Sequence, residues 1–367
     1  MRILEVVLSL TSGGAERLVV DLCNELSKQE DVTLLVLKDL RNGENGFYRN
    51  DVSSRVKIVN LGFKDGFNLS YLFKVFSAVK SINPDIVHVH SASDKYCLLP
   101  VMFHSKSMKF IQTIHNDVKS YCDFLHKFII KILGRLGRIS FVTISQKNFE
   151  DFNTCYPSVS NALIYNGRAV LQKTEKFQEV KSEIDSLKID SSTKVILHIA
   201  RCARQKNQHL LINSFNKWVE KGANAILLVC GSSYDSELGK GLKSISGDRI
   251  HFLGEKNNIS DYLFNCDAFV LSSLYEGMPI TVLEAMSLKI PVLSTPVCGV
   301  VDVIENGVNG YISKDFTEES FLDMLNSFEK DFGGIKEESS TDISNRFSIS
   351  QCAASYRDLF RSKLSAC

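Results

Sequence analysis

The sequence predicts an α/β protein built from two Rossmann-like, doubly wound domains that face each other across a cleft. The chain has 367 residues, a length that favours two domains over one. Short apolar, β-branched runs alternate with longer amphipathic stretches, which is the pattern of βα units in a parallel sheet. One polar stretch without a strand pattern, residues 168–193, interrupts the alternation near the middle of the chain.

Seven apolar runs precede the polar stretch and six follow it, and each is expected to be a strand. Helical patterns fill several gaps, for example at residues 15–27 and 71–81. The runs are residues 3–10, 32–37, 56–61, 86–90, 110–115, 141–145, 162–165, 194–200, 225–230, 250–253, 268–272, 291–294 and 311–313. We therefore assign residues 1–168 to a first domain and 169–347 to a second, with the amphipathic tail 348–367 packing back on the first.

Composition and charge exclude several classes of protein. The formal net charge is +1, so no global field points to nucleic acid. The ten cysteines are scattered without CxxC spacing, which argues for a reducing compartment and against a zinc site or a disulfide framework. The N-terminus carries Glu5 too early for a good signal peptide, and no apolar run approaches the roughly 20 residues that span a bilayer. We expect a cytoplasmic protein.

The most informative stretch is residues 269–296, FVLSSLYEGMPITVLEAMSLKIPVLSTP. An apolar strand ends in two serines, a loop carries Glu276, and Pro279 is expected to open a short helix that contains Glu284. The free amides of a helix's first turn, with the positive end of its dipole, favour an anion. Glu284 could lie on a solvated face, but its neighbours are apolar, so we expect it to have a partner. The stretch predicts a phosphate-sized anion site with a carboxylate on each side.

Two basic residues follow another predicted strand. Arg201 ends the run 194–200, and Lys206 stands five residues later as a helix begins. Both could reach one diphosphate, the arginine as a fork and the lysine as a point charge. Arg204 lies between them and could substitute, and a solvated basic loop is the alternative. No two aspartates are separated by one residue, so the DxD pattern for a divalent ion is absent, and we expect no metal.

Two further features lie at the ends of strands in the first domain. Gly13 and Gly14 directly follow the first strand, where they could bring the backbone close to a ligand or simply form a tight turn. The GxGxxG fingerprint is incomplete, which disfavours a nicotinamide cofactor. His115 ends the run 110–115 and is a candidate partner for a hydroxyl or carbonyl group. Other strand histidines, His88 and His90 among them, are interpreted as core residues.

The segment 119–138, KSYCDFLHKFIIKILGRLGR, is basic and strongly apolar. Lys127, Lys131 and Arg135 fall at helical spacing, and Arg138 lies close to the same face. Such a helix is typical of a contact with a membrane surface. The alternative is a domain helix with its apolar side in the core. We favour the membrane contact, which would make the protein peripheral on the inner face of the cell membrane.

Taken together, these motifs resemble the family 4 retaining glycosyltransferases of the GT-B fold, over nearly the whole chain. The resemblance is carried by SGGAER at 12–17, the pair Arg201 and Lys206, FLGEKNNI at 252–259, and EGMPITVLEAM at 276–286, and YNG at 165–167 and ENGVNGY at 305–311 also fit. The resemblance implies that the backbone from Gly254 to Ile259 would border the nucleotide's base. The pair of glutamates with seven residues between them is the most specific mark.

The resemblance also implies roles for individual residues. Glu284 would hold the ribose hydroxyls, and Glu276 would hold the donor sugar together with backbone amides. His115 would contact that sugar near the reacting carbon, and the loop of Gly13 and Gly14 would lie by the phosphate or the acceptor. The amides concerned are those of Gly277, Met278 and Ile280 for the sugar and those of Thr281 and Val282 for the diphosphate, beside Arg201 and Lys206.

The sequence departs from the family pattern in places. Lys289 and Ala200 stand where glycine is common, Cys298 replaces the first of two glycines before Val300, and Asp302 replaces a glutamate. None of these changes removes a group with an implied catalytic role. Cys298 and Asp302 are expected to reshape the pocket for the donor sugar.

The resemblance implies an enzyme that moves a hexose or N-acetylhexosamine from a nucleotide-diphosphate sugar, a UDP-sugar by family analogy, to a hydroxyl of a glycan acceptor. An acceptor linked to lipid, in surface polysaccharide biosynthesis, is expected from the SGGAER start. Two alternatives remain open. A nucleotide-sugar 2-epimerase would need no acceptor, and a non-catalytic sugar-nucleotide sensor would bind the donor without transferring it.

Overall fold

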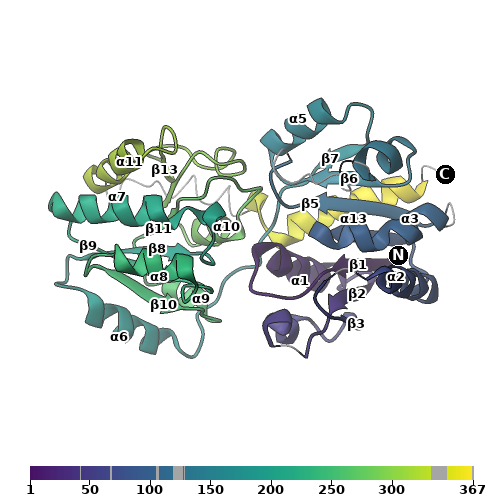
Figure 1. Ribbon diagram of the computed structural model, residues 1–367, viewed down its shortest axis with the longest axis horizontal. Helices are drawn as coiled ribbons and strands as arrows, with labels where there is room; N and C mark the ends of the chain where they lie inside the picture. The colour runs from purple at the N-terminus through teal and green to yellow at the C-terminus, as the bar shows by residue number, and fades with distance from the viewer. Residues whose placement is uncertain are drawn as a thin grey trace. The chain divides into compact units, whose positions relative to one another are not determined.

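The computed structural model divides the chain into two compact units. Unit 1 comprises Met1–Ala169 and Phe347–Cys367, and unit 2 comprises Val170–Arg346. The structure describes residues 1–41, 43–66, 68–104, 107–118, 127, 129–331 and 345–365. Each unit contains one sheet with helices packed against it (Figure 1).

Unit 1 is built on a seven-stranded parallel sheet in the order β3-β2-β1-β4-β5-β6-β7. Strands β1 and β4 are neighbours in the sheet but far apart in sequence. Strands β2 and β3 are added on one side of β1, and strands β4 to β7 are added on the other side. The carboxyl ends of such strands are where open α/β sheets bind ligands. The strands are β1 Arg2–Val7, β2 Asp31–Lys38, β3 Lys57–Phe63, β4 Ile86–His90, β5 Lys109–Ile114, β6 Ser140–Thr143 and β7 Asn161–Leu163.

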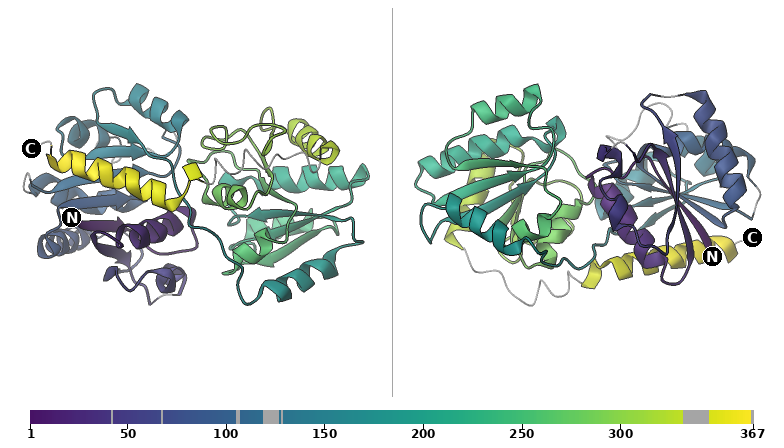
Figure 2. Two further views of the ribbon diagram at one scale, coloured as in Figure 1. Left: turned by 180° about the vertical axis from the view of Figure 1, so that it is seen from behind. Right: turned by 90° about the horizontal axis from the view of Figure 1, so that it is seen from below.

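Helices cover both faces of this sheet (Figure 2). The C-terminal helix α13 packs against α1, and its Tyr356 and Phe360 are fully buried. The helices are α1 Gly14–Leu26, α2 Leu69–Ile82, α3 Leu98–Phe103, α5 Gln146–Cys155 and α13 Ile349–Ser365, with short 3-10 turns η1 Gly43–Gly46, η2 Arg49–Asp51 and η3 Ser91–Cys97, and a π-helix η4 Ile129–Gly134. The last helix of the chain is therefore part of the first unit's core.

Unit 2 repeats the arrangement with six parallel strands in the order β10-β9-β8-β11-β12-β13. The strands are β8 Lys194–Ile199, β9 Ala225–Cys230, β10 Ile250–Gly254, β11 Ala268–Leu271, β12 Val292–Ser294 and β13 Gly310–Ile312. The helices are α6 Phe177–Leu187, α7 Gln208–Glu220, α8 Glu237–Ser244, α9 Ile259–Leu263, α10 Ile280–Ser287 and α11 Glu318–Lys330, with a 3-10 turn η5 Arg204–Lys206. Here β9 and β10 are added on one side of β8, and β11 to β13 are added on the other side.

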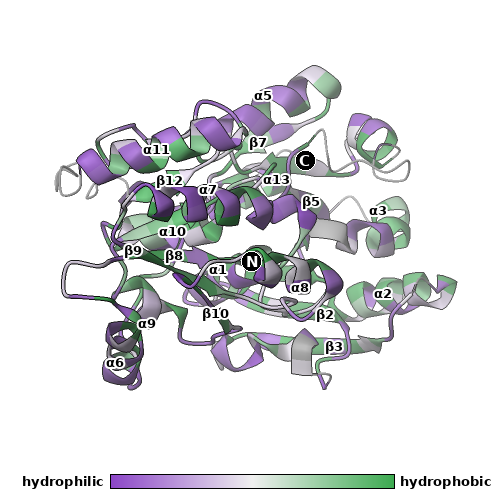
Figure 3. Cartoon of the chain, turned by 60° about the vertical axis from the view of Figure 1, so that its left-hand side comes forward, coloured by the Kyte–Doolittle hydropathy of each residue, from purple (hydrophilic) through white to green (hydrophobic). Residues whose placement is uncertain are grey.

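The two sheets confirm the predicted fold class of two doubly wound α/β domains. The strands begin and end within a few residues of the predicted runs, because buried β-branched runs are a strong local signal. Helices α7 and α11 carry both hydrophobic and hydrophilic residues along their length (Figure 3), as amphipathic helices on a sheet must. Among the described helices, none is both long and apolar enough to cross a bilayer.

Candidate functional site

The predicted site residues of unit 2 gather at the carboxyl edge of its sheet. Arg201 follows β8, Gly254 ends β10, and Glu276 lies in the loop after β11. Strands β8 and β11 pair directly. The strand order switches from one side of the sheet to the other between them, and ligands of doubly wound sheets bind at the carboxyl ends of the strands at such a point.

Lys206 and Glu276 form the centre of this edge. Lys206 Nζ donates to Glu276 Oε1 at 2.5 Å, and Ser273 Oγ donates to the same oxygen at 2.7 Å. Glu276 is 7% exposed, so its charge is nearly removed from water and depends on these two donors. The lysine also has two further N–H groups, which a ligand can use. The two residues stand 70 positions apart. From the sequence, Lys206 is assigned to the diphosphate and Glu276 to the donor sugar, and their pairing is not predicted.

The loops that carry this pair are tied to each other by hydrogen bonds. Ser272 Oγ donates to the carbonyl of Lys206 at 2.8 Å, and Thr295 Oγ1 donates to the carbonyl of Ser273 at 2.6 Å. The amide of Leu274 donates to the carbonyl of Gln205 at 2.8 Å. Ser272, Ser273 and Thr295 are all fully buried. These hydrogen bonds therefore fix the positions of the two loops that carry Lys206 and Glu276 relative to each other.

Arg201 lies two residues beyond β8 and is exposed. Its carbonyl accepts from Gln208 Nε2 at 2.9 Å, which ties it to the first residue of α7. A Cβ on Gly231 would lie 2.0 Å from the carbonyl oxygen of Ala200, so only glycine lets β9 approach the chain before Arg201 so closely. The backbone of Arg201 is fixed, while its guanidinium is accessible to a ligand.

The first turn of α10 differs from the prediction in one respect. The helix begins at Ile280, and Pro279 is its N-cap residue with φ −67° and ψ 124°, rather than its first helical residue. The amides of Val282 and Leu283 both donate to the carbonyl of Pro279, at 3.2 and 3.4 Å. Within the described residues, the amides of Ile280 and Thr281 have no such acceptor. These two are the better placed donors for an anion.

Of the remaining predicted residues of unit 2, three lie in or just before α10 and two lie at or beyond the end of β10. Glu284 lies within α10 and is 4% exposed, so its carboxylate is not on a solvated face. Gly277 and Met278 are buried in the loop before the helix. Gly254 is exposed with φ +72°, and its carbonyl accepts from the amide of Gly231 at 2.8 Å, whereas Ile259 begins α9.

Gly299 packs directly on the glutamate loop. It has φ +74°, and a Cβ added there would lie 2.1 Å from the carbonyl oxygen of Gly277 and 2.8 Å from Cα of Met278. A side chain at residue 299 would therefore push the loop that carries Glu276. The family pattern has two glycines here. This contact requires the second, Gly299, whereas Cys298 replaces the first.

Gly299→Ala should therefore lower both stability and donor binding. An alanine with positive φ costs about 1–2 kcal/mol, and the clash with Gly277 adds to that cost. Gly307→Ala is the matched control, since it has φ +75° but its nearest neighbour beyond the adjacent residues is Tyr311 Oη at 3.8 Å. Thermal unfolding with and without a nucleotide sugar separates the two effects. Equal losses of ligand-induced stabilisation in both variants would contradict the proposed contact.

The other predicted ligand contacts lie in unit 1. Gly13 is the N-cap of α1, with extended backbone angles and no side-chain cap, and Gly14 is the first residue of the helix. His115 directly follows β5 and is 8% exposed. Its Nε2 lies 3.0 Å from Nδ1 of His90. His90 of the neighbouring strand β4 therefore holds the imidazole of His115 in place through this hydrogen bond.

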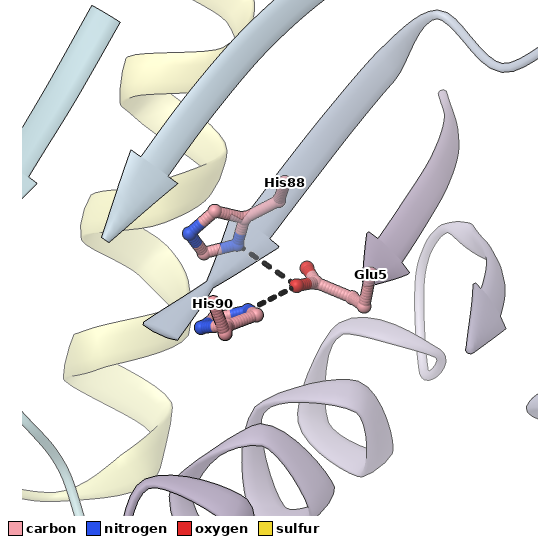
Figure 4. Close-up of side chains that lie close together, drawn as sticks. All are labelled: Glu5, His88 and His90. Carbon is pink, nitrogen blue, oxygen red and sulfur yellow. Dashed lines mark hydrogen bonds and ion pairs between the residues drawn. The ribbon is translucent and has the colours of Figure 1, made fainter. Parts of the chain in front are cut away.

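Behind His115 lies a buried charged cluster that sequence reasoning missed. Glu5 of β1 faces His88 and His90 of β4, and all three are fully buried (Figure 4). His90 Nε2 lies 2.6 Å and His88 Nδ1 2.9 Å from Glu5 Oε2. A charged residue inside an otherwise apolar strand, and two histidines at alternate positions of another, were the available signals. The interpretation of both histidines as core residues is correct for their burial and omits this partner.

The same cluster is the one group within the described residues whose geometry could hold a metal ion. Its three ligand atoms lie within 4.8 Å of one another. Glu5 Oε2, however, already serves both histidines at hydrogen-bonding distances. Glu5 Oε1 and His88 Nδ1 have no hydrogen-bond partner among the described residues, and the expectation of no metal stays a prediction.

The basic segment divides its side chains between the core and the surface. Ile129, Ile130 and Leu133 of η4 are buried in the core of unit 1. Ile132 and Leu136 are exposed at 43% and 67%, and all four predicted contact residues, Lys127, Lys131, Arg135 and Arg138, are exposed as well. The helical spacing was predicted for an α-helix, whereas residues 129–134 form a π-helix.

Comparisons with known proteins cover almost the whole chain. Residues 12–168 match the family described as Glycosyltransferase Family 4, and residues 179–346 match the family described as Glycosyl transferases group 1. The chain is 28% identical, over 70% of each sequence, to an uncharacterized glycosyltransferase of Methanocaldococcus jannaschii. It is 25% identical to the O-antigen biosynthesis glycosyltransferase WbnH of Escherichia coli, over 66% of this chain and 82% of that one.

Solved structures give the same picture at lower identity. The Anabaena protein HepE, in complex with UDP and glucose, superposes with a TM-score of 0.80 at 17% identity, covering 99% of this chain and 100% of HepE. A sucrose-phosphate synthase from Thermosynechococcus elongatus superposes with a TM-score of 0.81 at 14% identity, over the full length of both chains.

Proposed function

The chain is a glycosyltransferase of the GT-B fold with a Glycosyltransferase Family 4 domain and a Glycosyl transferases group 1 domain, and we propose that it transfers a sugar from a nucleotide-diphosphate donor to a hydroxyl of a glycan with retention. The observation that carries the proposal is the ion pair between the partly buried Lys206 and the buried Glu276, in the loop that leads into α10. It combines a cation and free amides, which suit a leaving diphosphate, with a carboxylate, which suits sugar hydroxyls.

The proposed reaction needs no protein nucleophile. The bond between the anomeric carbon and the diphosphate oxygen breaks, and the carbon bonds to the acceptor oxygen on the same face. The acceptor's proton passes to the leaving phosphate. Negative charge grows on the diphosphate as the bond breaks, so Arg201, Lys206 and the amides of Ile280 and Thr281 stabilise the transition state more than the bound donor.

UDP is the proposed nucleotide, because the structural neighbour HepE is seen with UDP and glucose. Thermal shift with a panel of nucleotide sugars tests this choice, since a ligand that binds only the folded state raises its melting temperature. Stabilisation by UDP-sugars, followed by transfer to an acceptor, supports the proposal. A new sugar isomer from donor alone would indicate an epimerase, and binding without transfer to any of many acceptors would indicate a sensor.

We further propose that the acceptor is linked to lipid and that unit 1 meets a membrane surface. Exposed apolar side chains accompany the basic segment: Phe103 of α3 is 66% exposed and Leu136 is 67% exposed. Exposed apolar residues with adjacent cations are the composition of an interfacial contact.

Charge reversal at Lys127, Lys131 and Arg135 should abolish flotation with liposomes that contain anionic lipid. Each cation near such a surface contributes about 1 kcal/mol, so reversing three removes most of the attraction. Reversal of three exposed lysines of unit 2, Lys181, Lys221 and Lys240, changes the net charge equally and is the control. Equal flotation of both triple variants, or none of the wild-type protein, would contradict the membrane proposal without touching the transfer activity.

A further inference from the structure

A chain of six polar side chains crosses the buried centre of unit 1 and ends at His115. In order, its members are Tyr356, Thr113, His88, Glu5, His90 and His115. Glu5 and the two histidines lie on β1 and β4, the two strands between which the strand order switches sides in the sheet. Glu5 is directly opposite His88 in the register of these strands. This polar chain has two arms that meet at Glu5, and they lead to different places.

The first arm leads from Glu5 to the strand end. Glu5 Oε2 lies 2.6 Å from His90 Nε2, and His90 Nδ1 lies 3.0 Å from His115 Nε2. Glu5 and His90 are fully buried, whereas His115 keeps 8% of its surface. The other ring nitrogen of His115, Nδ1, is buried and has no hydrogen-bond partner among the described residues. The arm therefore ends in one unsatisfied nitrogen at the carboxyl edge of the sheet.

The second arm leads from Glu5 into the core. His88 Nδ1 lies 2.9 Å from Glu5 Oε2, and His88 Nε2 lies 2.8 Å from Thr113 Oγ1. Thr113 Oγ1 in turn lies 2.8 Å from Tyr356 Oη of α13. Tyr356 is fully buried. This arm therefore ends in the packing between the sheet and the C-terminal helix.

The charge states in the network follow from burial and proximity. Burial alone raises the pKa of Glu5, but the adjacent His88 and His90 outweigh it and lower the pKa to about 2. Burial, with the nearby His88, lowers the pKa of His90 to about 4 against the opposing effect of Glu5. Burial, with His90 and His88, also lowers the pKa of His115 well below its usual value. At neutral pH, Glu5 is a carboxylate and both His90 and His115 are neutral.

A carboxylate at the junction sets the direction of each hydrogen bond in the first arm. Ionised Glu5 can only accept, so His90 carries its proton on Nε2. A neutral imidazole has one N–H, so Nδ1 of His90 accepts, and His115 must donate to it from Nε2. The single proton of His115 is then used, and its Nδ1 presents a lone pair. An acceptor buried without a partner costs about 1–3 kcal/mol, which a ligand hydroxyl would offset.

We propose that Glu5 and His90 are positioning residues that hold His115 as the neutral Nε2–H tautomer, so that Nδ1 accepts a hydrogen bond from a hydroxyl of the donor sugar. The identity of that ligand rests on the proposed function, whereas the tautomer does not. The assignment makes His115 an acceptor toward its ligand, so a sugar that lacks the contacted hydroxyl would leave Nδ1 unpaired and bind less well.

The two histidines of β4 provide a matched pair of variants. His88 and His90 are equally buried and approach the same oxygen of Glu5, so His88→Leu and His90→Leu should cost similar stability. Only His90 touches His115. His90→Gln is the conservative variant, because its amide group can donate to Glu5 and its carbonyl can accept from His115.

The test combines ¹⁵N NMR of labelled histidines with steady-state kinetics of the full chain, using His115→Gln to assign the resonance. In the wild-type protein and in His88→Leu, His115 should show the single Nε2–H tautomer. In His90→Leu the tautomers should mix, and kcat should fall on the order of 10–100-fold, the scale of residues that orient ligand-binding histidines. His90→Gln should recover both readouts.

Several outcomes would overturn the assignment. A wild-type His115 protonated on Nδ1 refutes it without any variant, even if a leucine variant fails to fold. Equal loss of kcat in His88→Leu and His90→Leu, with unchanged His115 resonances, reduces the network to a structural one. A stoichiometric metal in the purified protein would replace these hydrogen bonds. Absence of transfer with every donor would refute the proposed function and leave the tautomer result standing.

Discussion

Lys206→Ala is expected to lower kcat for sugar transfer about 10²–10³-fold, the loss seen when one donor to a developing oxyanion is removed. Lys206 is already held in place by its bond to Glu276 at 2.5 Å. Its remaining N–H groups are available to the leaving diphosphate. The loss should appear mainly in kcat, since the charge on the diphosphate grows as the bond breaks.

The same substitution should also cost stability, which must be measured separately. Without Lys206, the 7% exposed carboxylate of Glu276 keeps its bond from Ser273 and loses its counter-charge. Thermal unfolding reports that loss, and Lys206→Arg retains the charge as a further comparison. Lys217→Ala is the control, because that lysine is exposed on α7 and pairs with Glu318. Turnover of Lys206→Ala within a few-fold of the wild-type value would remove the lysine from the proposed site.

Glu284→Ala is expected to raise the KM for the donor about 10²–10⁴-fold, with a smaller change in kcat. Two charge-assisted hydrogen bonds to ribose hydroxyls are worth about 1.5–3 kcal/mol each, and about 1.4 kcal/mol corresponds to a factor of ten. These bonds form in the bound donor and persist in the transition state, so their loss is a loss of uniform binding.

The measurement for Glu284 should include binding of the free nucleotide. Calorimetry with UDP tests the ribose contact without any sugar or acceptor. Glu237→Gln, a substitution of an exposed glutamate in the first turn of α8, is the control. Unchanged affinity for UDP in Glu284→Ala would contradict the ribose assignment. A fall in kcat without a change in KM would move Glu284 to the group that acts on the leaving diphosphate.

The strands show how much of the fold could be predicted from residue order. The runs 86–90 and 225–230 were predicted with the observed bounds, and the others differ by a few residues. Buried strands of a parallel sheet are continuous apolar runs, so they are visible without any tertiary information. Pro279 is where local reasoning failed: a proline suits both the N-cap and the first turn, and the choice depended on the loop that enters α10.

The site divides along the same line. Glu276, Glu284, Arg201 and Lys206 were predicted from the chain alone, because each stands in a short motif next to a strand end, and their roles stay predictions. The ion pair of Lys206 with Glu276 was not, since the two stand 70 residues apart and meet only because β8 and β11 are neighbours in the sheet. Glu5 gave a weak signal as one charge in an apolar strand. Its partners come from β4 and its network reaches α13, and such contacts arise only when a parallel sheet and its covering helix bring distant segments together.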